Sequence, residues 1–249
     1  MILAANLQSP QLVPLALQHL NDKDPVVQYW AFKAATQTGV IQQLTSDITH
    51  DEKTTEAILN ALKTQAASGL HPEIQKMVVS FCAAFNQPKA RDILLAIANQ
   101  RTTAYKNWTV TDESLDTVLL TVLGATAEQS SEPDIKKVFG RTFAELYALV
   151  LQRYSLGKGT FSSSHINRLL TVIAEVDQSV LNKIMGFKTR ILEAIKRGQG
   201  LQSQYETLLG NQMFRGQLAE KFKFDYGKDA SGKALTAPPA LGPMPKETK

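Results

Sequence analysis

Histidines and acidic residues are the side chains most able to do chemistry in this chain of 249 residues. The four histidines are far apart in the sequence, and only His50 lies beside carboxylates, in the stretch from Asp47 to Asp51. A metal site needs three or four converging ligands, whereas Asp and Thr between two helices commonly cap a helix. We therefore expect no metal site and no cofactor. The histidines are His19, His50, His71 and His165.

A second acidic group, Asp112, Glu113 and Asp116, stands at the start of a predicted helix. Carboxylates are favoured there because the amino-terminal end of a helix carries a partial positive charge. The pattern indicates helix capping and gives no catalytic residue.

The single cysteine, Cys82, excludes a disulfide within the chain and any metal site made of cysteines. Its neighbours Phe81 and Phe85 place it on an apolar helical face. No nearby charge lowers the pKa of its thiol, so we expect a small buried apolar side chain.

The stretch Gly157-Lys158-Gly159-Thr160 is similar to the end of a phosphate-binding loop. A true loop of that kind needs an earlier glycine, a lysine followed directly by Ser or Thr, and a preceding strand, and all three are missing. The stretch is therefore predicted to join two helices. The sequence shows no nucleophile elbow and no dinucleotide fingerprint, which favours a non-enzyme, although catalytic groups converging from distant helices stay open.

Apolar residues recur along nearly the whole chain at the three- and four-residue spacing of amphipathic helices, and no stretch alternates with a period of two. The sequence therefore predicts an all-α fold of about ten helices. Their expected ranges are 10–20, 25–38, 52–67, 72–86, 88–101, 112–126, 133–154, 163–176, 178–197 and 201–223.

Three of the prolines that begin these helices, Pro25, Pro72 and Pro133, follow the turn of a helical hairpin. Pro88 fits the same apolar template without standing at a hairpin turn. Proline suits the first helical position because its missing N–H is not needed there. Counted from each of Pro25, Pro72 and Pro133, positions +2, +5, +6, +9, +10 and +13 are apolar in sixteen of eighteen cases, which predicts one buried stripe on each helix. These positions are Val27, Trp30, Ala31, Ala34, Ala35, Thr38, Ile74, Met77, Val78, Phe81, Cys82, Phe85, Ile135, Val138, Phe139, Thr142, Phe143 and Leu146.

Each proline-led helix follows another amphipathic helix, so a helical hairpin recurs at least three times. The stretch from Leu20 to Ala31, which reads LNDKDPVVQYWA, resembles the turn between the two helices of a HEAT or armadillo repeat. The resemblance covers about residues 10–154 and implies an α-α superhelix, a solenoid of stacked helical hairpins. The basic residue usual in that motif is replaced by Gln28 and Gln75 in the first two units.

The net charge of +4 is unevenly distributed. Residues 1–130 contain 9 Lys and Arg against 12 Asp and Glu, whereas residues 131–249 contain 18 against 11. If residues 177–197 form one helix, Lys183, Arg190 and Arg197 share a side of it, unless Gly186 breaks the helix and resets its phase. The candidate partner-binding residues are Lys183, Lys188, Arg190, Lys196 and Arg197.

The sequence divides into a helical-repeat domain over 1–225 and a Pro- and Lys-rich carboxy-terminal tail over 226–249, which we expect to be flexible because it can bury little apolar area. A proline-rich recognition site for a partner is the alternative reading of that tail. No apolar run is long enough to span a bilayer, and the start from Met1 to Asn6 has no export signal. The default expectation is a cytoplasmic protein, or an extracytoplasmic one if a leader was removed.

The leading hypothesis is a non-catalytic protein-binding scaffold of the helical-repeat type, with a partner that is acidic if it binds the basic half. The alternative is a helical-repeat protein that binds or processes nucleic acid through the same basic half. A small-molecule-binding helical domain is a third hypothesis, for which the sequence offers no specific support.

Overall fold

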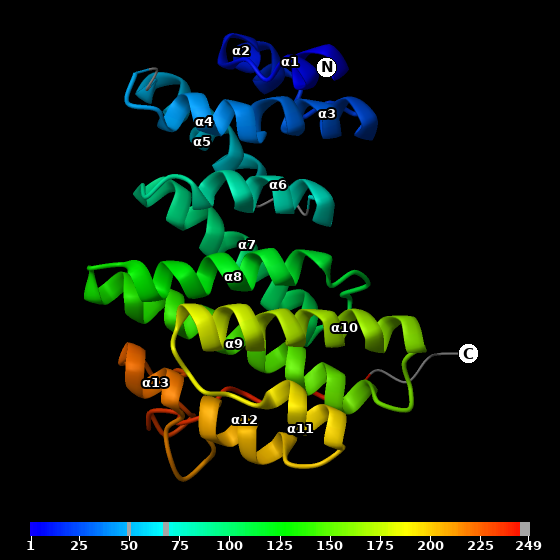
Figure 1. Cartoon of the computed structure of the whole chain (residues 1–249), viewed down its shortest axis with the longest axis vertical. Coiled ribbons are helices and arrows are strands. Elements are labelled where there is room, and N and C mark those ends of the chain that lie inside the picture. The colour runs from blue at the N-terminus through cyan, green and yellow to red at the C-terminus, as the bar shows by residue number, and fades with distance from the viewer. Residues whose placement is uncertain (49–50, 67–69, 245–249) are drawn as a thin grey trace. The chain divides into compact units, whose positions relative to one another are not determined.

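The computed structural model of the chain describes residues 1–48, 51–66 and 70–244, and every regular element in these ranges is a helix (Figure 1). The all-α prediction is therefore confirmed. Apart from the helices, these ranges contain two isolated antiparallel bridges, Gly210 with Arg215 and Lys228 with Ala234. In the same ranges, no helix is both long and apolar enough to cross a membrane.

The chain divides into two compact units, Met1–Gln100 (unit 1) and Arg101–Lys249 (unit 2). The division falls inside one helix, α7. The helices of unit 1 are α1 (Ile2–Leu7), the short 3-10 helix η1 (Pro10–Leu12), α2 (Val13–Gln18), α3 (Pro25–Thr36), α4 (Thr38–Thr45), α5 (Glu52–Ala66), α6 (Pro72–Ala83) and the first part of α7 (Pro88–Lys106). Those of unit 2 are the end of α7, α8 (Ser114–Gln129), α9 (Pro133–Gly157), α10 (Ser163–Glu175), the π-helix η2 (Val176–Ile184), α11 (Ile191–Arg197), α12 (Leu201–Leu209) and α13 (Gln217–Phe222).

The predicted proline-led helix starts are confirmed, because α3, α6 and α9 begin at Pro25, Pro72 and Pro133. The residue before the proline caps the first two helices. A carboxylate oxygen of Asp24 accepts a hydrogen bond from the backbone of Val26 at 2.8 Å, and His71 Nδ1 accepts one from Glu73 at 3.3 Å. These bonds satisfy amide groups that have no partner inside the helix.

In unit 1, α3 packs against α1, α2 and α6. The apolar stripe predicted for α3 and α6 faces this core, where its members Ala31, Phe81 and Cys82 are almost completely buried. The ring of Phe81 packs on that of Phe85 with centroids 4.7 Å apart. The stripe is therefore the surface along which these helices assemble.

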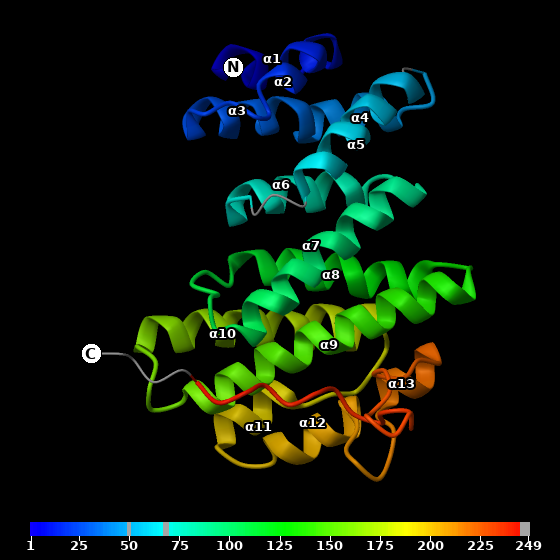
Figure 2. The same ribbon diagram turned by 180° about the vertical axis from the view of Figure 1, so that it is seen from behind.

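In unit 2, the long helix α9 packs against α8, α10, α12 and α13, as Figures 1 and 2 show from opposite sides. Phe139, Phe143 and Tyr147 on α9 are fully buried. Gly140 lets α13 approach closely, because a Cβ at that position would lie 2.7 Å from atoms of Phe222. One member of the predicted stripe, Val138, is 43% exposed.

Several helix boundaries differ from the prediction. The range 201–223 is two helices, α12 and α13, because the chain turns at Gly210, whose φ of 98° suits glycine. The range 178–197 is also divided, at Gly186, where φ is 73°. The short helices α1 and α4 were not predicted, since each offers too few turns for a clear periodic signal.

The carboxy-terminal segment packs on the helices of unit 2, and Figure 2 shows it running along α9. Tyr226 and Leu241 are 3% and 8% exposed, and Pro238 is buried. The expectation that residues from 226 onward add nothing to the core is therefore wrong for these side chains. Composition alone misled, because a few well-spaced apolar residues are enough to attach a proline-rich segment.

Candidate functional site

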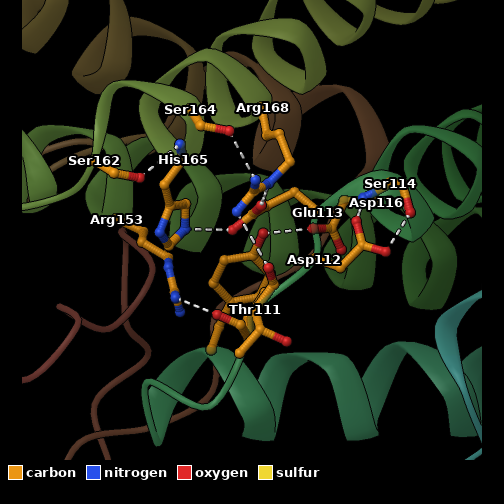
Figure 3. Close-up of polar contacts among 12 residues, drawn as sticks. Thr111, Asp112, Glu113, Ser114, Asp116, Arg153, Ser162, Ser164, His165 and Arg168 are labelled. Atoms are coloured by element: carbon orange, nitrogen blue, oxygen red, sulfur yellow. Dashed lines mark hydrogen bonds and ion pairs between the residues drawn. The ribbon is translucent and has the colours of Figure 1, made fainter.

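The most highly charged interior region of the described residues lies in unit 2, where the end of α7, the start of α8 and helix α10 meet (Figure 3). Arg101 donates to both carboxylate oxygens of Asp116, from Nε at 2.6 Å and from Nη2 at 2.8 Å. The same Nη2 also donates to the backbone oxygen of Asp112. Asp116 is completely buried and Arg101 is 8% exposed, so this is an internal ion pair.

Tyr105, one turn after Arg101 on α7, donates its hydroxyl to Asp116 at 2.5 Å. Burial raises the pKa of the Tyr105 phenol well above its ordinary value, so the hydroxyl stays protonated and remains a donor. Burial also raises the pKa of the Asp116 carboxyl, and the bonds from Arg101 and Tyr105 oppose that shift. Together the three side chains fix the end of α7 to the first turn of α8.

A second buried carboxylate, Glu113, lies next to this pair and binds two residues of α10. Its Oε1 is 2.6 Å from His165 Nε2, and its Oε2 accepts from Arg168 Nε at 3.0 Å. Figure 3 shows both side chains directed from α10 toward Glu113. The ring of His165 also stacks on Phe161, with centroids 4.1 Å apart and planes 5° apart.

Arg153 on α9 lies beside the aromatic residues that border this region. Its side chain is buried, and its guanidinium lies 5.3–5.5 Å from the ring centroids of Tyr105, Trp108 and Phe161. Nη2 donates to the backbone oxygen of Val110, whereas Nε and Nη1 have no hydrogen-bond partner in the part of the chain that the structure describes. The aromatic faces therefore supply part of the stabilisation that a carboxylate would give.

Trp108 has an unusual backbone conformation, with φ of 60° at the carboxy-terminal end of α7. Glycine is the usual residue for such a left-handed cap, so a bulky side chain here is strained. The backbone bonds of Trp108 to Tyr105 and of Thr109 to Ala104 close the cap. The cap and the contact with Arg153 fix the direction of the indole ring.

Chemically, this region is a structural support. Glu113 and Asp116 are fully buried, and each of their carboxylate oxygens has a nitrogen or hydroxyl partner. The predicted capping role fits Asp112, which accepts from the backbone and the hydroxyl of Ser114 at 2.9 and 2.8 Å. Glu113 and Asp116 do more than cap, since both pair with cations. The sequence signal was present as an acidic cluster, but their partners lie 52, 55 and 15 residues away.

The predicted partner-binding residues lie in a different part of unit 2. Lys183 is on η2, Lys188 and Arg190 are in the connection after Gly186, and Lys196 and Arg197 end α11. All five side chains are exposed. Gly186 breaks the predicted helix, so these five side chains do not share one helical face. The structure therefore agrees with the second alternative, in which Gly186 resets the helical phase.

This connection is held by side chains that the sequence did not single out. Asp177 accepts from the Thr189 hydroxyl at 2.5 Å and from the backbone of Leu192 at 3.1 Å. Asn182 accepts from the backbone of Thr189 at 2.9 Å. Arg190 lines two open hollows, and its backbone N–H donates to Gln204 Oε1 at 3.1 Å.

Other sequence candidates have ordinary structural roles. Gly157–Thr160 forms the end of α9 and the turn before α10, as predicted. Cys82 is buried, and burial raises the pKa of its thiol to about 12. No group of three His, Cys, Asp or Glu side chains among the described residues is arranged to hold a metal ion. His50 lies outside the described residues.

No family model, no curated protein and no solved structure matches this chain.

Proposed function

We propose that this chain is a non-catalytic protein-binding scaffold of the HEAT-like helical-repeat type, which binds an acidic partner through the basic segment 183–197 of unit 2. The recurring proline-led helices with a common apolar stripe support the repeat assignment. In such proteins each hairpin buries its inner face against its neighbours and leaves an outer surface for partners.

The observation that carries the binding role is the exposure of all five basic side chains of segment 183–197. That segment holds five basic residues and a single acidic one, Glu193. Glu193 meets Arg197 at 3.5 Å, and both side chains are more than half exposed, so this pair neutralises little of the segment. In contrast, Arg101 and Arg168 pair with buried carboxylates of unit 2.

The charge of unit 2 as a whole favours the same partner. Residues 101–249 contain 20 Lys and Arg against 15 Asp and Glu, whereas residues 1–100 contain 7 against 8. An excess of positive charge raises the local concentration of an anionic partner and speeds association. This contribution weakens with salt, because the Debye length is about 8 Å at physiological ionic strength.

The experiment compares capture of proteins from the native lysate by three forms of the chain. The test variant is Lys183→Glu, Arg190→Glu and Arg197→Glu together. The matched control reverses three exposed lysines elsewhere, Lys23, Lys53 and Lys137, and changes the net charge equally. A protein retained by wild type and control but lost with the test variant supports the proposal. Equal retention by all three forms contradicts it.

Nucleic acid is the second candidate, because the same excess of positive charge attracts phosphates. Fluorescence anisotropy with labelled duplex DNA and RNA at low and physiological salt separates the two. A scaffold for an acidic protein gives only weak, sequence-independent retention. A nucleic-acid-binding protein gives tight binding at physiological salt, with a steep salt dependence that the test variant flattens and the control variant keeps.

A further inference from the structure

We propose that unit 2 carries a second interaction surface, the face formed by Trp108, Gln152 and Tyr205, and that it recognises an extended proline-rich segment of a partner. This face is separate from segment 183–197, so it does not depend on the proposed function above. In the structure it is occupied by the chain's own residues 236–242, which show how such a segment binds.

The backbone of the bound segment is recognised by side chains. Gln152 Oε1 on α9 accepts from the backbone of Leu241 at 2.5 Å, and its Nε2 lies 3.4 Å from the oxygen of Pro239. Trp108 Nε1 donates to the oxygen of Gly242 at 3.2 Å. Proline-rich segments typically dock in grooves lined by aromatic side chains, which Trp108 and Tyr205 supply here.

The recognising side chains are themselves fixed. Gln152 Nε2 also donates to the hydroxyl of Tyr205 on α12 at 2.6 Å, which orients the amide. Trp108 is held by its strained cap and by the guanidinium of Arg153, 5.5 Å from its ring. The donors are therefore in place before a ligand binds, which reduces the entropy lost on binding.

The burial pattern of the segment has the period of a polyproline helix. Pro238 and Leu241 are buried, Met244 is half-buried, and Pro239, Ala240, Gly242 and Pro243 are exposed. A polyproline II helix has three residues per turn, so positions 238, 241 and 244 lie on one side. The surface thus selects a ligand with proline and leucine three residues apart.

The chain's own segment fills the surface incompletely. A largely apolar cavity of about 400 Å³ lies beside it, with Leu156, Leu201, Tyr205, Ala237, Ala240 and Leu241 in its wall. Leu156 is 49% exposed. The small side chains of Ala237 and Ala240 leave this space, and a partner segment with a larger apolar residue at either position would bury more surface. Such a partner can displace the internal segment.

The test uses the full chain and a fluorescent peptide with the sequence of residues 235–244. Leu241→Asp releases the internal segment, because its buried side chain then carries a charge. Pro243→Asp is the matched control, since Pro243 is exposed on the same segment. We expect the peptide to bind Leu241→Asp at least tenfold more tightly than wild type or control. Adding Gln152→Ala to Leu241→Asp should abolish that gain.

A second peptide, carrying the change Ala240→Leu, should bind more tightly than the first because it fills the cavity. The Trp108 indole N–H provides an independent readout by NMR in a Trp30→Phe background, in which Trp108 is the only tryptophan. Its resonance should shift in Leu241→Asp and return when peptide is added. This readout stays valid if the variant loses some stability.

The proposal is overturned if the indole resonance is unchanged in Leu241→Asp, or if neither peptide binds this variant more tightly than wild type. A concentration-dependent dimer of wild type that Leu241→Asp abolishes would make a second copy of this chain the occupant, and would also overturn the assignment to a partner.

Discussion

Replacing Arg101 by methionine tests whether the buried charges of unit 2 form a coupled support. The change keeps much of the aliphatic stem. Among the described residues, it leaves the completely buried Asp116 carboxylate with the hydroxyl of Tyr105 as its one side-chain donor. Breaking a buried ion pair by removing one partner costs about 3–5 kcal/mol. Because one hydrogen bond to the carboxylate remains, we expect a cost near the lower limit, about 3 kcal/mol.

The double variant Arg101→Met/Asp116→Leu removes both charges and should be far less damaging than the sum of the two single variants. What it loses is mainly the acceptor for the Tyr105 hydroxyl, which costs about 1–3 kcal/mol. The assay is urea unfolding followed by Trp108 fluorescence in the Trp30→Phe background. Lys106→Met, an exposed site on the same helix, is the control and should be nearly silent.

The pH dependence gives the same prediction a second test. In Arg101→Met the pKa of Asp116 is raised by burial without the opposing cation, so the folded state takes up a proton more readily than the unfolded state. The cost of Arg101→Met should therefore shrink as the pH falls from 7 toward the ordinary carboxyl range. A cost below about 1 kcal/mol, or a double variant equal to the sum of the singles, would refute the reasoning.

Three further predictions concern packing. Phe81→Ala should lower the free energy of unfolding by about 3–5 kcal/mol, whereas Lys76→Ala, at a surface ion pair, should change it by less than about 1 kcal/mol in chemical denaturation. Gly140→Ala should destabilise despite the better helix propensity of alanine, by about 1–3 kcal/mol, because the new methyl group meets Phe222; a stabilised variant in the same assay would show that α13 can move away. Cys82 should resist alkylation at pH 8 in the native protein and react once unit 1 unfolds, because burial holds the pKa of its thiol at about 12; rapid native labelling by mass spectrometry would contradict this.

The sequence predicted the local features of the fold well. A proline at the first helical position and an apolar stripe of period 3.6 are properties of neighbouring residues, so Pro25, Pro72 and Pro133 marked true helix starts. The sequence leaves the break at Gly186 open, because apolar periodicity continues on both sides of it. The positive φ of Gly186 in the structure shows that the helix is interrupted there.

The pairing of the buried charged side chains could not be predicted from residues that are neighbours in the sequence. The sequence predicts a helix-start carboxylate at Glu113, whereas its partners His165 and Arg168 come from a helix about fifty residues later. A lone histidine and an arginine on a polar helix face give no sign of such pairing. The role of Trp108 was hidden for the same reason, because its strain and its bond to Gly242 exist only in the folded chain.

The carboxy-terminal segment shows why composition underestimated how much of a proline-rich stretch is buried. Ordering such a stretch is less unfavourable than ordering most sequences, because proline already restricts its own φ. Two buried side chains, Pro238 and Leu241, and a few bonds from Gln152 and Trp108 therefore suffice to place it. A stretch held by so few contacts is also one that a better ligand can replace. The same physical property, low ordering entropy, explains both its docking on α9 and its proposed displacement by a partner.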